Sequence, residues 1–389
     1  MKVTSILFVT LLLAGMLLGA CSSAATPTAT PPVTKVATPP QQVTAAPSAW
    51  DNLVAEAKKE GTVSMYITSW TPQMTAAVAQ GFKDKYGINV EFSPFSRGAE
   101  LMAKVQAEQR ASLFNVDIVG AGGGTLITTM KPEGVLGKIE PLLVLPEVTD
   151  AKNWSGGVFP FMDKDKTAVA MIASVQRSVL CNTGMVKQGE IVSYADLLKP
   201  QYKGKMILND PTVTGVGNAW ITTLALFVWD PARTKDYLQQ LIKQQEVVVE
   251  RDNRVHVETV ARGKYPIGIA PNPEVVSDFL KVAAPLEVVG VKEGIFVSPA
   301  AGAIAVPSKM AHPNAGKLFA NWLLGKEGQT AFSVSSGNPS LRNDVSTAGF
   351  NPMFLTQPGD TLFYDSEEAL GFRGKALAMA QEVIGGAKK

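Results

Sequence analysis

Four short runs of hydroxyl residues and glycines could bind an anion or an electron-rich oxygen. They are residues 68–70, 96–98, 120–125 and 210–218, and each follows an expected strand and leads into an expected helix. The start of a helix offers free backbone N–H groups and a partial positive charge, which suit such ligands. Arg97 adds a guanidinium that can hold a carboxylate or a phosphonate through two parallel hydrogen bonds. The candidate ligand-binding residues in these runs are Thr68, Ser69, Trp70, Ser96, Arg97, Gly123, Thr125, Thr212, Thr214 and Gly217.

The same residue types also build ordinary turns. Ser and Thr cap helices, and Gly adopts the left-handed conformations that turns require. Most arginines are exposed, so an ordinary surface position is an equal alternative for Arg97. The glycines of residues 120–124 do not form a dinucleotide-binding fingerprint. Thr125 occupies the third glycine position, and no acidic residue closes a following strand at the expected distance.

No catalytic or metal-binding motif is found in the sequence. It lacks G-x-S-x-G, S-x-x-K, H-E-x-x-H and the P-loop pattern, which argues against an enzyme. His256 and His312 are far apart and do not have metal-ligand spacing, and His312, before Pro313, is expected at the surface. Cys181 follows two apolar residues and is expected to be a buried structural thiol. We therefore expect no metal and no cofactor.

Strands and helices must alternate to position the four turns. Ser48 and Asp51 predict a capping box that opens a helix ending at Gly61, and Pro72 predicts the start of a second helix that Gly87 ends. Period-two and period-3.6 patterns then predict the other elements. Strands are expected at 62–68, 88–92, 116–119, 205–209, 246–250, 265–270, 286–290 and 303–306, and helices at 98–111, 218–229, 273–280 and 313–325, with another ending at Gly263. This alternation predicts an α/β protein with two lobes, each a doubly wound sheet.

The N-terminus has the pattern of a targeting segment. Residues 1–21 combine a charged start, an apolar centre and small residues, and Leu18-Gly19-Ala20-Cys21 resembles the bacterial lipobox, in which the cysteine is lipidated. A retained transmembrane helix is the alternative, and either one places the body of the protein outside the cytoplasm. Residues 22–48, rich in Ala, Thr and Pro, are expected to form a disordered spacer. The expected lobes are 49–178 and 179–298, with 299–389 returning to the first lobe and ending in helices.

The composition excludes a general nucleic-acid binder. The chain has 36 Lys and Arg against 34 Asp and Glu, without a basic cluster. It is 46% hydrophobic and 18% charged, as a globular protein is, and no second apolar stretch is long enough to span a membrane.

Seven segments of the sequence together resemble the extracellular solute-binding proteins of ABC importers, in the branch that includes the ferric-ion binders. They are "AKKEGTVSMYITSW", "FKDKYGINVEF", "VDIVGAGGG", "LNDPTVTGVGNAW", "VARGKYPIGIA", "EGIFVSPAAGAIAV" and "HPNAGKLFANWLLGKEGQ". The resemblance implies a two-lobed, type II periplasmic-binding-protein-like fold with a ligand cleft between the lobes, which closes on binding. It also implies an ABC permease and its ATPase as partners, and a monomer attached to the membrane through its lipid.

One departure from that family bears on the ligand. Ferric-ion members carry adjacent tyrosines where this chain has residues 271–274, Pro-Asn-Pro-Glu, so Asn272 becomes the candidate ligand contact there. Only isolated tyrosines remain as possible iron ligands: Tyr66, Tyr194, Tyr202 and Tyr265. We therefore expect a small polar organic solute, with an anion favoured over ferric iron. A sugar is less favoured, because few aromatic residues fall at the predicted cleft turns and Trp70 is the main candidate platform. A ligand sensor and an extracytoplasmic enzyme are the alternatives from other functional classes.

Overall fold

The computed structural model describes residues 48–387, and within them a first sheet forms the centre of one lobe. Its strands run in the order β2-β1-β3-β13-β4, and β5 pairs with β13. Strands β1, β2 and β3 are parallel, as predicted, whereas β13 is antiparallel to β3, β4 and β5. The bounds are β1 Thr62–Thr68, β2 Asn89–Phe95, β3 Ile118–Ala121, β4 Leu136–Gly137, β5 Ala168–Ala170 and β13 Ala303–Pro307. The predicted signal peptide, Cys21 and nearly all of the predicted spacer lie outside the described residues.

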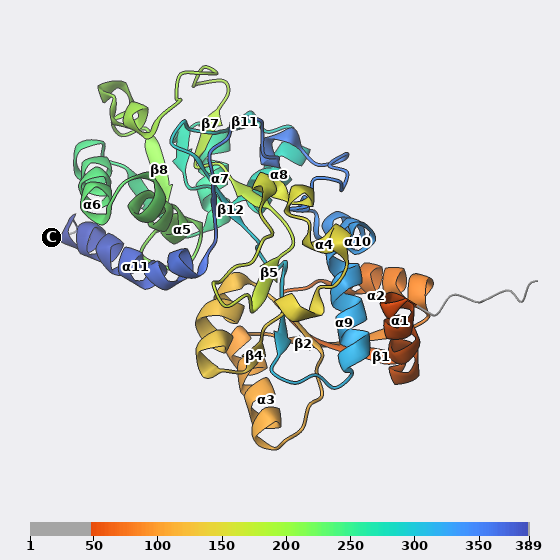
Figure 1. The fold of residues 1–389 in the computed structure, drawn as a ribbon. Helices are drawn as coiled ribbons and strands as arrows, with labels where there is room; N and C mark the ends of the chain where they lie inside the picture. Colours follow the sequence, from red (N-terminus) through yellow and green to blue (C-terminus); the bar gives the residue numbers. More distant parts are fainter. Residues whose placement is uncertain (1–47, 388–389) are drawn as a thin grey trace, which may run out of the picture. The chain divides into compact units, whose positions relative to one another are not determined.

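Helices cover both faces of this sheet (Figure 1). Helices α1 (Ala49–Glu60), α2 (Pro72–Tyr86), α9 (Pro313–Leu324) and α10 (Lys326–Ser336) pack together on one side, and α3 (Gly98–Arg110) lies on the other. The capping box of Ser48 and Asp51 is present, and α1 ends at Gly61 in the left-handed conformation. Helices α1 and α2 begin and end where their caps predict, because a side-chain acceptor satisfies one of the first free amides and glycine tolerates the left-handed end.

A second sheet forms the centre of the other lobe. Its order is β11-β7-β10-β8-β9, with β8, β9 and β10 parallel and β7 antiparallel to both β10 and β11. The strands are β7 Val179–Asn182, β8 Met206–Asn209, β9 Val248–Glu250, β10 Ile267–Ile269 and β11 Leu286–Val289. The helices are α5 Val216–Thr223, which continues as a π-helical turn at Leu224–Val228, α6 Pro231–Gln239, α7 Asn253–Ala261 and α8 Pro273–Lys281. Separate hydrophobic cores lie beneath α5 and α6 and beneath α7 and α8.

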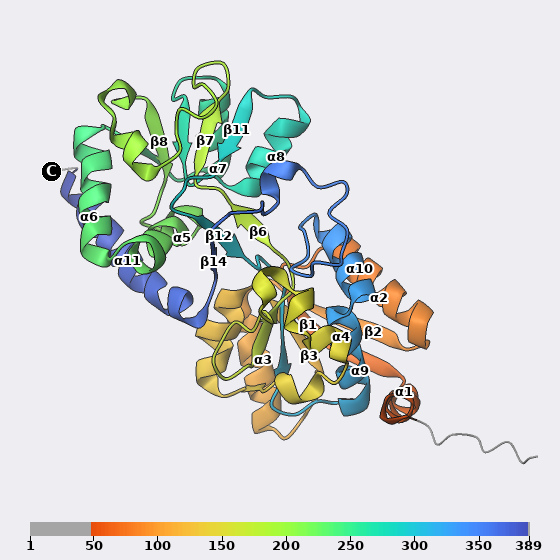
Figure 2. The same ribbon diagram turned by 45° about the horizontal axis from the view of Figure 1, so that its top comes forward.

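Three strands connect the lobes. β6 (Ser174–Gln176), β12 (Ile295–Ser298) and β14 (Leu362–Tyr364) form a small sheet in the order β14-β12-β6, and Figure 2 shows it between the two larger sheets. After β14, helix α11 (Glu367–Ala387) packs against α5 and α6. The segment after residue 299 thus contributes α9 and α10 to the first lobe and α11 to the second.

The strand register places the predicted turns on the side of each sheet that faces the strands crossing between the lobes. The end of β3 pairs with the start of β13 at Ala121 and Ala303, and the end of β10 pairs with the start of β7 at Ile269 and Val179. The crossing strand β12 leads directly into β13, and the crossing strand β6 leads directly into β7. The carboxyl ends of the parallel strands, where ligands bind in open α/β sheets, therefore lie on the sides of the lobes nearest the crossings.

Short helical elements complete the fold. They are α4 Pro146–Thr149 and the turns η1 Gly124–Met130, η2 Lys131–Glu133, η3 Glu140–Leu142, η4 Ala151–Asn153, η5 Ser155–Gly157, η6 Tyr194–Leu198, η7 Pro200–Tyr202, η9 Gln240–Gln244 and η10 Pro352–Phe354.

Within residues 48–387, no helix combines the length and the apolar character needed to cross a membrane.

The two histidines and Cys181 are buried or partly buried within the fold. Cys181 is buried, as predicted, and burial raises the pKa of its thiol to about 12. His256 is fully buried beneath β8, where its Nε2 lies 3.2 Å from the carbonyl oxygen of Ile207. His312 is partly exposed, with 30% of its side chain accessible, and its Nδ1 lies 3.0 Å from the buried carboxylate of Asp117. Asp117 also accepts from the backbone N–H of Ser64, which ties the start of α9 to β1.

Candidate functional site

The turn after β1 places its three predicted residues in different surroundings. Thr68 is buried at the end of the strand, and Ser69 is exposed in the left-handed conformation with φ of 61°. Trp70 is only 7% exposed, and its Nε1 donates to the carbonyl oxygen of Ala301 at 3.0 Å. Its ring packs against Phe332 with centroids 4.6 Å apart. In this structure Trp70 is therefore a core residue whose ring is not available as a platform for a sugar.

The second and third turns, at residues 96–98 and 120–125, lie next to each other on one edge of the first lobe. Ser96 and Arg97 are exposed, and Arg97 occupies the N-cap of α3 without a capping hydrogen bond from its side chain. Gly98 lies so close to Thr125 that an added Cβ would overlap its side chain. Among residues 48–387, no carboxylate forms an ion pair with Arg97. This charge is available to a ligand.

Close packing explains the glycines of the third turn. A Cβ at Gly122 would lie 3.0 Å from the carbonyl oxygen of Ala300, and one at Gly123 would lie 2.5 Å from Cε of Met162. Gly123 is buried under Met162 and the start of α11, whereas Thr125 is half-buried. We call the turns at 68–70, 96–98 and 120–125 the first-lobe edge.

In the second lobe, the polar side chains of the predicted turn are largely used within the protein. Asp210 accepts from the backbone N–H of Thr212 at 2.8 Å and from its Oγ1 at 2.6 Å. The Asn218 amide donates to the carbonyl oxygen of Arg373 in α11. Thr214 is exposed, and Gly217 packs directly on the carbonyl of Asn209, where an added Cβ would overlap the oxygen. Helix α5 begins after Gly215, which provides no side-chain cap, so its first amides remain open to a ligand.

The remaining predicted contact, Asn272, caps α8. Its Oδ1 accepts from the backbone N–H of Val275 at 3.0 Å, so this oxygen has a partner before any ligand arrives. Ala270, at the end of β10, has φ of 54°, which turns the chain sharply toward Asn272. We call the turns at 210–218 and 270–272 the second-lobe edge.

A small pocket at the second-lobe edge contains residues that the sequence reasoning missed. It measures about 10 Å³ and lies where β6 leads into β7, next to the start of α5 and the end of β10. The lining residues are Gln176, Arg177, Ser178, Val216, Trp220, Thr223, Ala270, Pro271 and Phe296. Gln176 and Ser178 are polar residues within a long apolar segment, 167–181, and that interruption was the available sequence signal.

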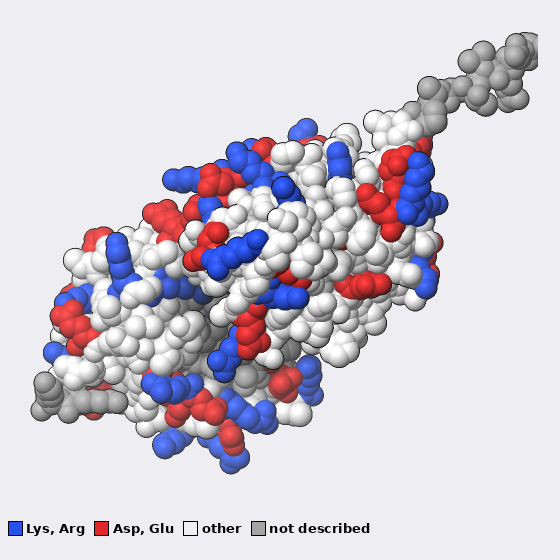
Figure 3. All heavy atoms as spheres, turned by 90° about the horizontal axis from the view of Figure 1, so that it is seen from below, with Lys and Arg blue, Asp and Glu red and all other residues white. Residues whose placement is uncertain are grey.

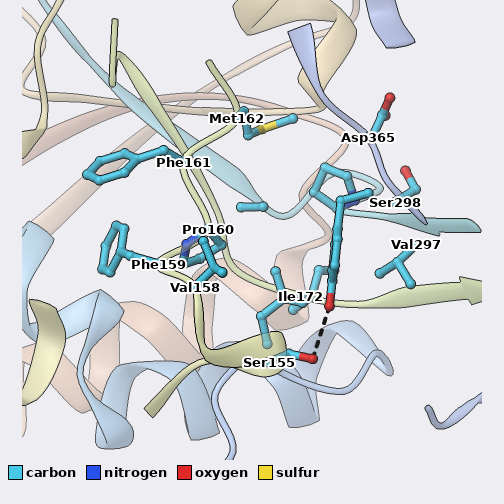
Figure 4. A pocket seen from close by; sticks show the side chains of 14 residues that line it. Ser155, Val158, Phe159, Pro160, Phe161, Met162, Ile172, Val297, Ser298 and Asp365 are labelled. Carbon is cyan, nitrogen blue, oxygen red and sulfur yellow. Dashed lines mark hydrogen bonds between the residues drawn. The ribbon is translucent and has the colours of Figure 1, made fainter. Parts of the chain in front are cut away.

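A larger cavity lies at the crossing strands and contains none of the predicted residues. It measures about 130 Å³, and its walls include Phe159, Phe161, Ile172 and Val297 (Figure 4). Ser155 Oγ and Tyr364 OH lie 3.1 Å apart at its side, as the dashed line in Figure 4 shows. Its lining is mostly apolar, with Ser298 and Asp365 among its few other polar residues.

A wider groove of about 490 Å³ separates α8 from the end of α10. Glu274 and Asp278 line it, but Lys281 pairs with Asp278 at 2.9 Å. Figure 3 likewise shows positive and negative side chains interspersed over the face it displays. The groove therefore lacks a concentrated charge that would select a ligand.

A partly buried charge cluster holds the start of α11. Nζ of Lys131 lies 2.9 Å from Asp163, 2.8 Å from Asp165 and 2.7 Å from Glu367. Burial opposes the charge of Lys131, but its hydrogen bonds to the three carboxylates outweigh burial and raise its pKa. The cluster attaches the first residue of α11 to the first lobe, while the body of the helix packs in the second.

Three of the four isolated tyrosines are hydrogen-bonded within the protein, and the fourth, Tyr265, is half-buried against the core beneath α7 and α8. Tyr66 donates to Glu108, Tyr194 to Ser178 and Tyr202 to Glu190, and all three are buried. Burial raises the pKa of Tyr194 and of Tyr202 to about 12, which disfavours the tyrosinate form. Within residues 48–387, His, Cys, Asp and Glu do not gather in groups of three that could hold a metal ion.

Comparison of the sequence identifies relatives of the chain. Residues 77–354 match the family model described as bacterial extracellular solute-binding protein. The chain is 23% identical over 322 residues to spermidine/putrescine-binding periplasmic protein 1 of Haemophilus influenzae, which covers 81% of this chain and 84% of that relative.

Solved structures show the same fold. Ferric iron-binding protein A of Mannheimia haemolytica, in an open conformation, matches with a TM-score of 0.67 and 17% identity, over 83% of this chain and 98% of that one. The periplasmic binding protein AfuA of Actinobacillus pleuropneumoniae, with fructose-6-phosphate bound, matches with a TM-score of 0.56 and 22% identity, over 84% and 99% of the two chains. The predicted type II periplasmic-binding-protein fold is thereby confirmed.

The family is described as extracellular and solute-binding, and the Haemophilus influenzae relative and AfuA are named as periplasmic binding proteins. Since the family model spans more than half of the sequence, the chain belongs to the bacterial extracellular solute-binding protein family.

Proposed function

We propose that this chain is a lipid-anchored substrate-binding protein of an ABC importer that captures a small anionic organic solute. The observation that carries this proposal is Arg97. It is exposed, has no ion-pair partner among the described residues, and stands at the start of α3 beside Thr125. A guanidinium and helix-start amides at one place favour a carboxylate or a phosphate group.

The second-lobe edge would complete the site. We place Arg97 and the turn at residues 212–218 on opposite sides of the cleft, with one solute between them. The amides at the start of α5 are free of a side-chain cap, and Thr214 is exposed. A ligand that contacts both lobes stabilises only the closed form, so affinity and closure are coupled.

Ferric iron is a weaker candidate ligand than an organic anion. Iron bound through Tyr194 or Tyr202 would require a buried, hydrogen-bonded phenol with a raised pKa to ionise. We expect no visible tyrosinate-to-iron charge-transfer band when the protein is titrated with ferric citrate. A strong band that disappears on Tyr→Phe substitution at one of these positions would support iron instead.

A ligand panel tests the proposal directly. Thermal-shift measurements with carboxylates, phosphonates, sugar phosphates, amino acids, polyamines and ferric salts identify ligands that bind only the folded form, because such ligands raise the melting temperature. We expect the largest rise with an anionic organic compound. A response confined to polyamines, which the Haemophilus influenzae relative is named for, would overturn the choice of an anion.

The anchor has its own test. Cys21→Ser should move the protein from the membrane fraction to the soluble extracytoplasmic fraction or leave the signal uncleaved, because the acceptor sulfur is lost. A mature N-terminus upstream of Cys21, together with unchanged fractionation, would contradict a lipoprotein. A permease and an ATPase encoded beside this chain would favour transport over ligand sensing.

A further inference from the structure

The start of helix α11 and the residue after β14 contact both edges. The body of α11 packs against α5 and α6 in the second lobe, and its start contacts the turn η1 of the first lobe (Figure 2). A Cβ at Gly123, in the first-lobe edge, would lie 3.4 Å from Cδ1 of Leu370 and 3.8 Å from Oδ2 of Asp365. The carbonyl oxygen of Arg373 accepts from the amide of Asn218, in the second-lobe edge, at 3.2 Å. Residues 365–373 therefore connect the two edges.

Arg373 lies on the side of α11 that faces the second-lobe edge. Gln381, eight residues further along the helix, donates to the carbonyl oxygen of Thr212 at 3.3 Å, and residues at this spacing share one side of a helix. Helical side chains point back toward the N-terminus of their helix. The Arg373 side chain does so, because its Nη2 lies 3.1 and 3.0 Å from the two carboxylate oxygens of Asp365. The guanidinium thus reaches from the second-lobe edge toward the carboxylate beside Gly123.

One nitrogen of this guanidinium is open to a ligand. The side chain of Arg373 is 26% exposed, whereas that of Asp365 is only 4% exposed. Nη2 is held by Asp365, and Nε is enclosed by the protein. Nη1 is not enclosed, and it has no hydrogen-bond partner within residues 48–387. Because the guanidinium is planar, the carboxylate that holds Nη2 also fixes the direction of the N–H groups on Nη1.

We propose that Arg373 is a second cationic contact for the solute, with the N–H groups of its Nη1 donating to a carboxylate or phosphate oxygen. The inference rests on the proposed function and deepens it. Gly123 lies two residues before Thr125, whose side chain contacts Gly98 next to Arg97, so both arginines serve the same edge. Two guanidinium groups favour a solute that carries at least two negative charges, such as a phosphate ester or a polycarboxylate, over a monocarboxylate.

A purely structural ion pair is the competing role, in which Arg373 only holds Asp365 and the start of α11 in place. Two substitutions separate the roles, because Arg373→Gln and Asp365→Asn both break the ion pair but only the first removes the positive charge. A structural role predicts that both weaken anion binding. Contact with the solute predicts opposite directions, since Asp365→Asn stops neutralising the guanidinium and leaves it to the anion.

The experiment is calorimetry of the full chain with citrate, fructose 6-phosphate, inorganic phosphate and acetate as probes, and urea unfolding reports the stability of each variant. We expect Arg373→Gln to weaken binding of the multiply charged anions about tenfold or more, as loss of a hydrogen bond to a charged group does. Arg373→Lys should recover part of that affinity. Asp365→Asn should bind these anions at least as tightly as the wild type.

Lys375→Gln is the matched control. Lys375 is an exposed cation two residues after Arg373, on another side of α11. Its removal takes the same charge from the same helix and should leave anion affinity within about a factor of two of the wild type. If Arg373→Gln does not fold, Asp365→Asn and Arg373→Lys decide. Retained binding in the first and weaker binding in the second support contact, and weaker binding in both supports the structural role.

The outcomes separate the two proposals. If a multiply charged anion binds and Arg373→Gln keeps wild-type affinity, or weakens binding no more than Lys375→Gln or in parallel with Asp365→Asn, this inference is wrong and the proposed function stands. The same holds if acetate alone binds. If none of the four anions binds, the proposed function fails and this inference fails with it.

Discussion

The first-lobe edge and the second-lobe edge use the same residue types in different ways. In the first lobe, Ser69, Ser96 and Arg97 are exposed, and Arg97 makes no capping contact at the start of α3. In the second lobe, Thr212 bonds to Asp210 and Asn272 caps α8. The donors that remain there are the backbone amides at the start of α5.

This difference separates ligand binding from folding stability. The exposed side chains of the first-lobe edge, those of Ser69, Ser96 and Arg97, are not part of the core, so their removal should weaken ligand binding and spare the fold. Trp70 differs from them, because it is packed in the core. The second-lobe edge is held by local hydrogen bonds and by close backbone contacts. Substitutions there should reduce the free energy of unfolding, and they should affect binding only where they reach an open donor.

The largest expected effect is that of Gly217→Ala. The added Cβ would overlap the backbone oxygen of Asn209, which cannot rotate away, so the start of α5 must shift. Overpacking of this kind costs about 3 kcal/mol of unfolding free energy. In the first-lobe edge, Gly98→Ala meets the side chain of Thr125, including its Cβ at 3.0 Å, but no backbone oxygen, and should cost less than Gly217→Ala. Urea unfolding of both variants measures the difference.

Gly124→Ala is the control for these two substitutions. A Cβ at Gly124 has open space around it, so its stability should stay within about 0.5 kcal/mol of the wild type. Equal losses at Gly217 and Gly98 would show that the two edges tolerate substitution alike and would remove the distinction.

Arg97→Ala should weaken anion binding by about 1.5–3 kcal/mol, because it removes a charge-assisted hydrogen bond. Stability should be nearly unchanged, since Arg97 is exposed and makes no capping contact. Arg97→Lys should recover part of the affinity, because lysine keeps the charge but lacks the planar fork. Calorimetry with the tightest-binding anion of the panel measures the effect.

Arg110→Ala is the matched control, since Arg110 is an exposed arginine in the last turn of the same helix. It should bind the anion like the wild type. If Arg97→Ala binds the anion with wild-type affinity, Arg97 is an ordinary surface arginine, and the first-lobe edge contributes no charged side chain to binding.

Acid should destabilise the second lobe through His256. Burial lowers the pKa of His256 from 6.5 to about 4, so the folded protein keeps the ring neutral while the unfolded chain takes up a proton below pH 6.5. Stability is therefore lost as the pH falls from 6.5 toward 4, by about 2 kcal/mol between pH 7 and pH 5. His256→Gln should show a flatter pH dependence in urea unfolding over this range. An unchanged pH dependence of the unfolding free energy would indicate that titrating groups other than His256 control it.

The elements could be predicted from the sequence because their signals are local. Ser48 with Asp51, Gly61, Pro72 and Gly87 each act on neighbouring backbone, and the observed helices begin and end there. The turns of the first-lobe edge were predictable for the same reason, as residues between a strand and a helix.

The partners of these turns could not be predicted, because they depend on contacts distant in sequence. Trp70 meets Ala301, His312 meets Asp117, and Asn218 meets Arg373.

The smallest expected effect distinguishes a cap from a ligand contact at Asn272. Asn272→Ala removes the acceptor of the Val275 N–H and should cost about 1 kcal/mol of stability. Asn272→Asp keeps a capping oxygen and should retain stability. Because the cap already uses this oxygen, Asn272→Ala should change the calorimetric affinity for the anion by less than a factor of about three, or about 0.6 kcal/mol. A tenfold loss of affinity at wild-type stability would instead mean that Asn272 leaves the cap for the solute. The second-lobe edge would then contribute side chains to binding as the first-lobe edge does, and the proposed contrast between the two edges would not hold.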